Sequence, residues 1–207
     1  MKQKEKLLIF DFDGTIADTK SIYYKSIYDV VKRFGYSYKD IDRIIDLGMS
    51  LRKVLKKLGF SFLTSWFLHK EIMNNVEKYV NEVKKCKDVD SINGIRTKKI
   101  LVTNSLKEFV TPILRHLKIN CFNEIYGAED FADKAEFIKE YLKKRKLSRR
   151  NCYYVGDRAS DVITAGMSGC KSIIVSGKCA WDSKKEISKA NPDFIVSDIK
   201  DIRKIAK

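Results

Sequence analysis

Two carboxylates follow directly after an apolar run near the start of the sequence. Residues 7–10 read Leu-Leu-Ile-Phe, and the next five residues read Asp-Phe-Asp-Gly-Thr. Such a run is typical of a parallel strand covered on both faces, and open α/β sheets bind ligands beyond the carboxyl ends of their strands. In an extended segment, Asp11 and Asp13 point the same way. The pair predicts a cation site with oxygen ligands that suit Mg²⁺; a plain Asp-Gly turn is the alternative.

A second pair of carboxylates follows another expected strand. Residues 151–156 read Asn-Cys-Tyr-Tyr-Val-Gly, and Asp157 and Asp161 come next, four residues apart across the expected start of a helix. At that spacing both side chains face the crevice at the strand end. Aspartates in a first helical turn also stabilise the helix by themselves, which is the alternative interpretation.

Two further residues could bind a phosphate group. Thr103 lies where the expected strand at 98–105 gives way to a helix, and its hydroxyl and the exposed amides of a helix start suit an anion. Ser105 and Glu108 predict a capping box for that helix. Lys134 begins a later helix, and a crossover helix runs antiparallel to its strands, so Lys134 is expected at the same sheet edge as Thr103. By itself, Lys134 could equally be an ordinary surface lysine.

The elements that would position these residues alternate between strand and helix, apart from one long helical insert. Further strands are expected at 120–126, 171–175 and 191–196. The insert after the first strand has helical periodicity and predicts helices over residues 22–34, 41–47, 51–58 and 62–84. The last of these is expected to bury a stripe formed by Trp66, His69, Met73, Val76, Val80 and Val83.

The composition fits a folded core domain with an inserted subdomain. The chain has 207 residues, of which 44% are hydrophobic and 33% charged. Five cysteines are odd in number and lack Cys-x-x-Cys spacing, so we expect reduced packing residues rather than disulfides or a zinc site. No apolar run approaches the length of a membrane span, and residues 1–6 are polar. We therefore expect a cytoplasmic protein with no membrane partner.

The net charge of +15 permits attraction to many anions, including nucleic acids. Its densest run, at residues 143–150, reads Lys-Lys-Arg-Lys-Leu-Ser-Arg-Arg. This run could be a nucleic-acid patch or a solvated helix end whose cations are favoured by the helix dipole. We favour the helix end because no base-reading motif accompanies it.

The carboxylate motifs resemble those of a known family. Asp-Phe-Asp-Gly-Thr at residues 11–15 resembles the first motif of the haloacid dehalogenase superfamily, and Gly156 to Asp161 resembles its fourth motif, Gly-Asp-x-x-x-Asp. Thr103 matches the second motif, and Lys134 matches the third, although Ala135 stands where a proline often follows. The similarity covers nearly the whole chain, with the helical insert matched only in type.

The resemblance implies a role for each matching residue. Asp11 would be the nucleophile that forms an aspartyl-phosphate, and Asp13 the general acid and base. Thr103 and Lys134 would bind the phosphate group, together with the backbone amide of Asn104. The expected Mg²⁺ ligands are Asp11, Asp13 through its carbonyl and Asp157 directly, with Asp161 as a ligand through water or as an orienting partner.

The resemblance also implies the fold: a Rossmann-like parallel sheet in a three-layer α/β/α core, with an inserted α-helical cap of the C1 type. Residues 1–16 and 96–207 are expected to form the core, and residues 17–95 the cap. In relatives with such a cap, a loop between cap helices faces the site. Residues 48–52 are similar to that loop, which makes Ser50 and Arg52 candidates for substrate binding. A capped turn with a solvated Arg52 is the alternative.

The predicted function is a Mg²⁺-dependent phosphatase for a small phosphate ester, similar to phosphoglycolate phosphatases. A phosphomutase would use the same residues and return the phosphoryl group to its substrate. A nucleic-acid-binding protein that kept the fold is the non-enzymatic alternative, suggested only by the net charge. These patterns specify neither the substrate nor the oligomeric state.

Overall fold

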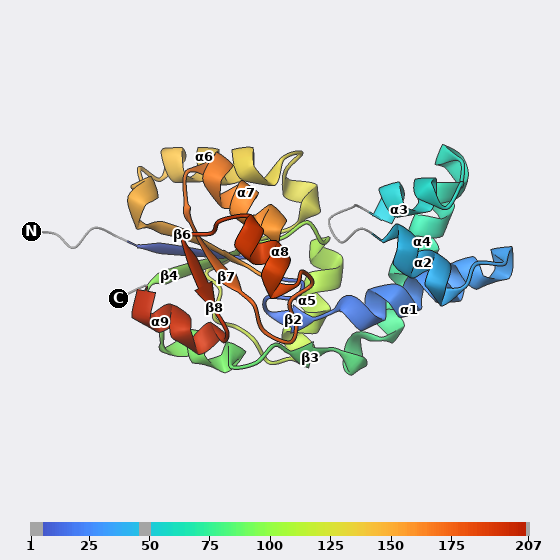
Figure 1. Ribbon diagram of the computed structural model, residues 1–207, viewed down its shortest axis with the longest axis horizontal. Helices are drawn as coiled ribbons and strands as arrows, with labels where there is room; N and C mark the ends of the chain where they lie inside the picture. The colour runs from blue at the N-terminus through green and yellow to red at the C-terminus, as the bar shows by residue number, and fades with distance from the viewer. Residues whose placement is uncertain (1–5, 46–50, 206–207) are drawn as a thin grey trace, which may run out of the picture. The chain divides into compact units, whose positions relative to one another are not determined.

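The computed structural model describes residues 6–45 and 51–205. By its contacts the chain divides into two compact units (Figure 1). The larger unit comprises Met1–Asp18 and Lys84–Lys207, and the smaller comprises Thr19–Val83. Within the described residues, no helix is both long and apolar enough to cross a membrane.

The larger unit is built on a six-stranded parallel sheet. Its order is β5 (Glu124–Tyr126), β4 (Lys98–Val102), β1 (Leu7–Phe10), β6 (Cys152–Gly156), β7 (Lys171–Val175) and β8 (Phe194–Val196). Strand β1 lies at the centre, with Leu7 opposite Lys98 of β4 and Cys152 of β6. All four residues of β1 are fully buried, as expected of a strand covered on both faces. The predicted Rossmann-like α/β class is confirmed.

Helices cover both faces of this sheet. They are α5 (Lys107–His116), α6 (Lys134–Lys144), α7 (Ala159–Ser168), α8 (Lys184–Lys189) and α9 (Ile202–Ile205). Leu7 and Ile9 of β1 pack in one cluster with Ile138 of α6 and Ala165 of α7. Phe10 faces the other way and contacts Phe122 edge-on, with ring centroids 5.7 Å apart. Figure 1 shows α6 and α7 on one side of the sheet and α9 on the other, which makes the three layers.

A short two-stranded ribbon lies where the chain leaves and re-enters the larger unit. Strand β2 (Ala17–Asp18) pairs antiparallel with β3 (Lys84–Lys85), with Ala17 opposite Lys85. The ribbon is followed by the 3₁₀ segment Val89–Gly94, which belongs to the larger unit.

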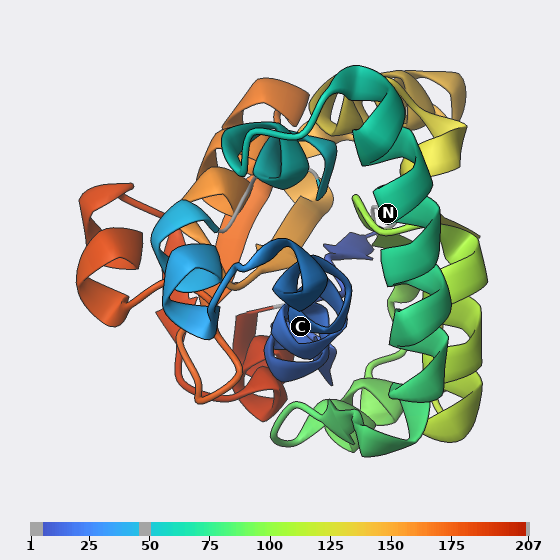
Figure 2. The ribbon, with the colours of Figure 1, turned by 90° about the vertical axis from the view of Figure 1, so that its right-hand side faces the viewer.

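The smaller unit is helical. It contains α1 (Lys20–Val31), α2 (Tyr38–Ile44), α3 (Leu51–Lys57) and α4 (Phe62–Lys78), of which α4 is seen side-on in Figure 2. A cluster of buried aliphatic residues joins all four helices, among them Val30, Ile41, Leu55 and Ile72. Gly35 ends the first helical segment with φ of 85°, a left-handed conformation that favours glycine.

The stripe predicted for the last of these helices is wrong in two respects. Helix α4 ends at Lys78, so Val80 and Val83 lie outside it, in and just after a 3₁₀ turn. Trp66 is 51% exposed, whereas Leu68 and Ile72 are buried. The buried face of α4 begins at Ser65 and continues with Leu68 and Ile72 at helical spacing, so it is shifted by one residue from the predicted stripe that begins at Trp66. The helix packs its aliphatic face against the unit and leaves its large aromatic side chains outside.

Candidate active site

The carboxyl ends of the three central strands bring the predicted residues to one edge of the sheet. Asp11 follows β1, Thr103 follows β4, and Asp157 follows β6. Strands β4 and β6 both pair with β1 in parallel register, so their ends lie side by side. The backbone N–H of Asp11 donates to the carbonyl of Val155, 2.8 Å away, which continues the pairing past the end of β1.

Three carboxylates form a buried cluster at this edge. Asp11, Asp157 and Asp161 each offer an oxygen within 4.8 Å of the others. Asp161 lies in the first turn of α7, where one of its oxygens accepts the backbone N–H groups of Asp157 and Arg158, both at 3.0 Å. Two donors hold Asp157: the Thr15 hydroxyl at 3.1 Å and the Trp181 backbone N–H at 2.7 Å. Backbone N–H groups therefore hold both Asp157 and Asp161, and the Thr15 hydroxyl is a further donor to Asp157.

The electrostatics of this cluster favour a cation. Burial, together with the charges of Asp161 and Asp11, raises the pKa of Asp157 well above its usual range. Burial and the Asp11 charge raise the pKa of Asp161 to about 6, in spite of Lys134 nearby. Asp157 and Asp161 therefore resist ionisation, and a bound cation would remove that resistance.

The residues present fit a magnesium ion. Carboxylate oxygens are the ligands that Mg²⁺ prefers, and the cluster supplies three of them. Ionised, the three acids beside one lysine leave two negative charges, which a divalent ion would balance. Gly14 completes the close packing around Asp157: a Cβ built on Gly14 would lie 2.3 Å from Asp157 Oδ2, and its φ is +74°. Only glycine fits here.

Lys134 lies against the carboxylates, as the crossover geometry predicts. Its ammonium group is 2.8 Å from Asp11 Oδ1 and donates to the Tyr154 hydroxyl at 2.9 Å. Burial by itself would lower the pKa of Lys134, but the charges of Asp11 and Asp161 outweigh burial and raise it. Lys134 is therefore a cation held at the site.

The segment after β4 differs from the sequence prediction in one detail. Helix α5 begins at Lys107 with Leu106 as its N-cap and no side-chain cap, so the predicted capping box of Ser105 and Glu108 is wrong. The Ser105 hydroxyl instead donates to Asp13 Oδ2 at 2.5 Å, and its backbone N–H donates to the Thr103 hydroxyl at 3.0 Å.

The predicted site residues of the larger unit differ in their surroundings. Thr103 is fully buried, whereas Asn104 is exposed. The carboxylate of Asp13 is not part of the three-acid cluster found among the described residues. An Mg²⁺ contact from Asp13 would therefore use its backbone carbonyl, as the resemblance implies.

Four residues that sequence reasoning did not assign complete the site: Thr15, Ser105, Tyr154 and Trp181. Tyr154 is fully buried in β6; its hydroxyl accepts from Lys134 and donates to Asp161, and burial with the charge of Asp11 raises its pKa well above its usual range. The strand contains two adjacent tyrosines, Tyr153 and Tyr154, directly before a carboxylate motif, and this pair was the available signal for it. Trp181 carried no such signal, because its role lies in its backbone N–H.

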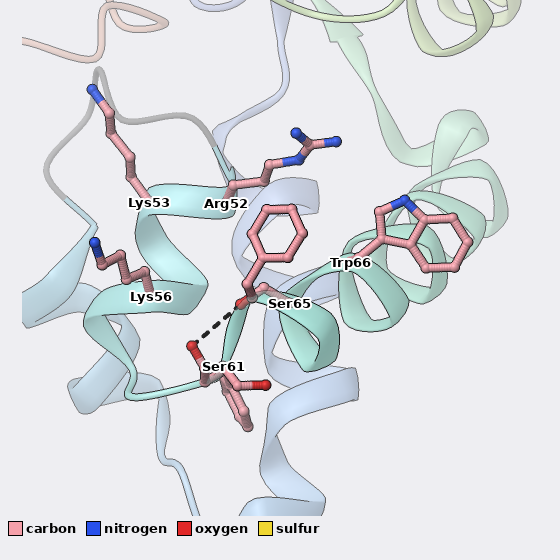
Figure 3. A pocket seen from close by; sticks show the side chains of 8 residues that line it. Arg52, Lys53, Lys56, Ser61, Ser65 and Trp66 are labelled. Atoms are coloured by element: carbon pink, nitrogen blue, oxygen red, sulfur yellow. Dashed lines mark hydrogen bonds between the residues drawn. The ribbon is translucent and has the colours of Figure 1, made fainter.

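The two cap candidates belong to the smaller unit. Ser50 lies outside the described residues. Arg52, in α3, lines a pocket of about 410 Å³ within that unit (Figure 3). Figure 3 shows Arg52 on α3 with Lys53 and Lys56, and Trp66 on α4. The pocket combines three cations with aromatic rings, the other lining residues being Phe60, Ser61, Phe62 and Ser65.

Comparison with known proteins gives consistent matches over most of the chain. The family model described as "Haloacid dehalogenase-like hydrolase" matches residues 8–175. The chain is 27% identical to "Putative pyrophosphatase PpaX" of Caldanaerobacter subterraneus subsp. tengcongensis, over 97% of this chain and 94% of that protein. It is 22% identical to a phosphoglycolate phosphatase of Vibrio parahaemolyticus, over 99% of this chain and 97% of that protein.

One solved structure is similar to this chain over its whole length. The crystal structure described as "Putative Phosphatase from Clostridium difficile" superposes with a TM-score of 0.79 at 26% identity, covering 100% of both chains.

Proposed function

The chain belongs to the haloacid dehalogenase-like hydrolase family and is a phosphatase of that family, and from this premise we propose that it hydrolyses a small phosphate monoester through an aspartyl-phosphate on Asp11. The observation that carries the proposal is the buried cluster of Asp11, Asp157 and Asp161 beside Lys134. The cluster supports the proposal because it would bring a nucleophile, a cation site and a positive charge together. Mg²⁺ held by these acids and the Asp13 carbonyl would neutralise phosphate charge during transfer.

In the first step, the Asp11 carboxylate attacks phosphorus, and the bond from phosphorus to the ester oxygen breaks. Asp13 gives its proton to the leaving oxygen. Lys134 balances charge on the transferred group, and the Thr103 hydroxyl orients it. Catalysis by such a site rests on positioning and charge neutralisation.

In the second step, water attacks the aspartyl-phosphate, and Asp13 takes the proton of that water. Inorganic phosphate leaves, and the Asp11 carboxylate is regenerated. The hydrogen bond from Ser105 to Asp13 supports this role, because it fixes the orientation of the acid that must serve both steps.

The test is inorganic phosphate release from an aryl phosphate by metal-stripped protein with and without Mg²⁺. We expect release only with Mg²⁺, and none from Asp11→Asn, which keeps the shape of the side chain without its nucleophilic charge. Asp193→Asn is the matched control, because Asp193 anchors β7 through Ser172 and lies outside the cluster. Turnover by Asp11→Asn above about one hundredth of wild type would contradict the proposal, since removing a covalent nucleophile costs far more than that. Transfer back to the substrate without phosphate release would indicate a phosphomutase.

We further propose that the smaller unit is a cap that selects the leaving group, with Ser50 and Arg52 as its binding residues. Arg52 supports this proposal, because it lines a pocket whose cations and rings suit an anionic or hydroxylated organic group. Arg52→Ala should weaken use of the preferred ester far more than use of a minimal phosphate donor. The control is Arg43→Ala, an exposed arginine of α2 outside the pocket. Equal loss on both substrates would remove Arg52 from the site.

A further inference from the structure

Two of the five cysteines are neighbours, although they lie far apart in the sequence. The thiol of Cys86 donates a hydrogen bond to the sulfur of Cys179, which also accepts the backbone N–H of Lys87. Both residues belong to the larger unit. All five cysteines are expected from the sequence to be packing residues, and the proposed hydrolysis uses neither of these two.

Each cysteine lies on a segment that borders the loop at residues 11–16, which follows β1. Cys86 directly follows β3, and its backbone N–H donates to the carbonyl of Ile16 at 3.0 Å. Cys179 lies in the loop between β7 and α8, two residues before Trp181. That loop reaches the active site, because the Trp181 backbone N–H holds Asp157 and a Cβ on Gly14 would lie 2.5 Å from the Trp181 ring.

The two thiols differ in access and in reactivity. Cys86 is buried, whereas Cys179 is partly exposed and can be reached by a small oxidant. The hydrogen bond from Cys86 lowers the pKa of Cys179, while the same bond and burial raise the pKa of Cys86. Because the thiolate is the reactive form, Cys179 would react first and Cys86 second.

We propose that Cys86 and Cys179 are a redox modification site, which hydrogen peroxide converts to a disulfide and a thiol reductant restores. The Cys179 thiolate attacks one peroxide oxygen, and the O–O bond breaks. Hydroxide departs as the leaving group, and Cys179 becomes a sulfenic acid. The Cys86 thiol then attacks that sulfur, an S–S bond forms, and the sulfenic oxygen leaves as water with the thiol proton. Peroxide is reduced and the two sulfurs are oxidised by two electrons.

The disulfide would alter the active site through the loop that carries Cys179. A disulfide holds its two Cβ atoms about 3.8 Å apart at a fixed torsion, a stricter geometry than a thiol hydrogen bond. Closing it would move the backbone near Trp181, which fixes Asp157. A displacement of about 1 Å in a positioned group can cost up to about a hundredfold in rate, so we expect oxidised protein to hydrolyse esters at least about tenfold more slowly.

The experiment treats the full-length protein with a small excess of hydrogen peroxide, blocks free thiols with N-ethylmaleimide and digests with trypsin. A lysine directly precedes each cysteine, so cleavage places Cys86 in the peptide Cys-Lys and Cys179 in Cys-Ala-Trp-Asp-Ser-Lys. We expect these two peptides to be joined, lighter by two hydrogens than their sum, and separated again by dithiothreitol. This readout does not depend on phosphatase activity, so it stands apart from the proposed hydrolysis.

Three variants give the controls. Cys86→Ser should form no cross-link and should leave Cys179 as a sulfenic or sulfinic acid. Cys179→Ser should lose both the cross-link and the inhibition by peroxide, with its untreated activity retained. Cys121→Ser removes a partly exposed cysteine outside the pair and should behave as wild type. Failure to form the Cys86–Cys179 link, a link to another cysteine, or a link that leaves hydrolysis unchanged would overturn the proposal.

Discussion

Replacing Asp161 by Asn should stabilise the metal-free protein, and more so at neutral than at acidic pH. Asp161 is 5% exposed, and its pKa is raised from 3.8 to about 6 by burial and by the charge of Asp11. Asn keeps an oxygen that can accept the N–H groups of Asp157 and Arg158. The substitution therefore removes a buried charge while these two backbone hydrogen bonds can be retained.

The direction in which stability changes with pH follows from the number of protons bound by the folded and the unfolded chain. Between the unfolded pKa and the folded pKa, the folded chain binds more protons than the unfolded chain, so stability is present below about pH 4 and is lost as pH rises through about pH 6. A shift of about two pKa units corresponds to about 3 kcal/mol once Asp161 is fully ionised. About half of that loss has occurred by about pH 5, so wild type should lose roughly another 1.4 kcal/mol between about pH 5 and about pH 7.5.

The assay is thermal unfolding in chelator at these two pH values. Asp161→Asn should unfold at a higher temperature than wild type, by about 6–12 °C near pH 7.5 and by about half as much near pH 5. Added Mg²⁺ should raise the unfolding temperature of wild type more than that of the variant, since a bound cation relieves the same repulsion. Asp193→Asn, which replaces an aspartate outside the cluster, is the control.

This expectation is refuted if Asp161→Asn is no more stable than wild type in chelator near pH 7.5. It is equally refuted if the gain is the same at both pH values, because the effect would then not come from the ionisation of a buried carboxylate.

Three other expectations concern the same site and the surface charge. Calcium in place of Mg²⁺ should inhibit phosphate release in competition assays, because its looser coordination lets Asp11 bind in a bidentate mode and lose its attacking geometry. Gly14→Ala should lower the free energy of unfolding by about 1–2 kcal/mol, measured by denaturant unfolding, from the left-handed backbone alone. The same substitution should reduce turnover at least about tenfold, measured by phosphate release, because the added Cβ would displace Asp157. Binding to DNA or RNA should be unselective and should fall at least about tenfold between roughly 50 and 200 mM salt, measured by fluorescence anisotropy.

The strand-end part of the site was predictable from sequence because it depends on topology alone. Parallel strands present their carboxyl ends at one edge, so Asp11, Thr103 and Asp157 had to meet once their strands were neighbours. Lys134 followed from the direction of a crossover helix. These arguments use only the order and direction of elements, which apolar runs and helical periods specify.

Features that depend on which of several possible hydrogen-bond or packing partners a residue takes were not predictable from the sequence. Ser105 satisfied the pattern for a capping box with Glu108, yet its hydroxyl donates to Asp13. In α4, the helical period was recognised but its phase was not, because Trp66 and Phe67 are as apolar as Leu68 and only packing separates them. Periodicity gives the spacing of a buried face, and tertiary contacts decide which residues occupy it.

The charge of the site is opposite in sign to that of the chain, and this contrast constrains how a substrate would bind. The chain carries +15, which attracts phosphate esters from a distance, whereas the cluster beside Lys134 would carry two negative charges once all three acids were ionised. A phosphate group would be repelled by that cluster until a divalent cation neutralised it. We therefore expect the ion to bind before the ester, so that ester binding measured in chelator is weak even where the surface charge is undisturbed.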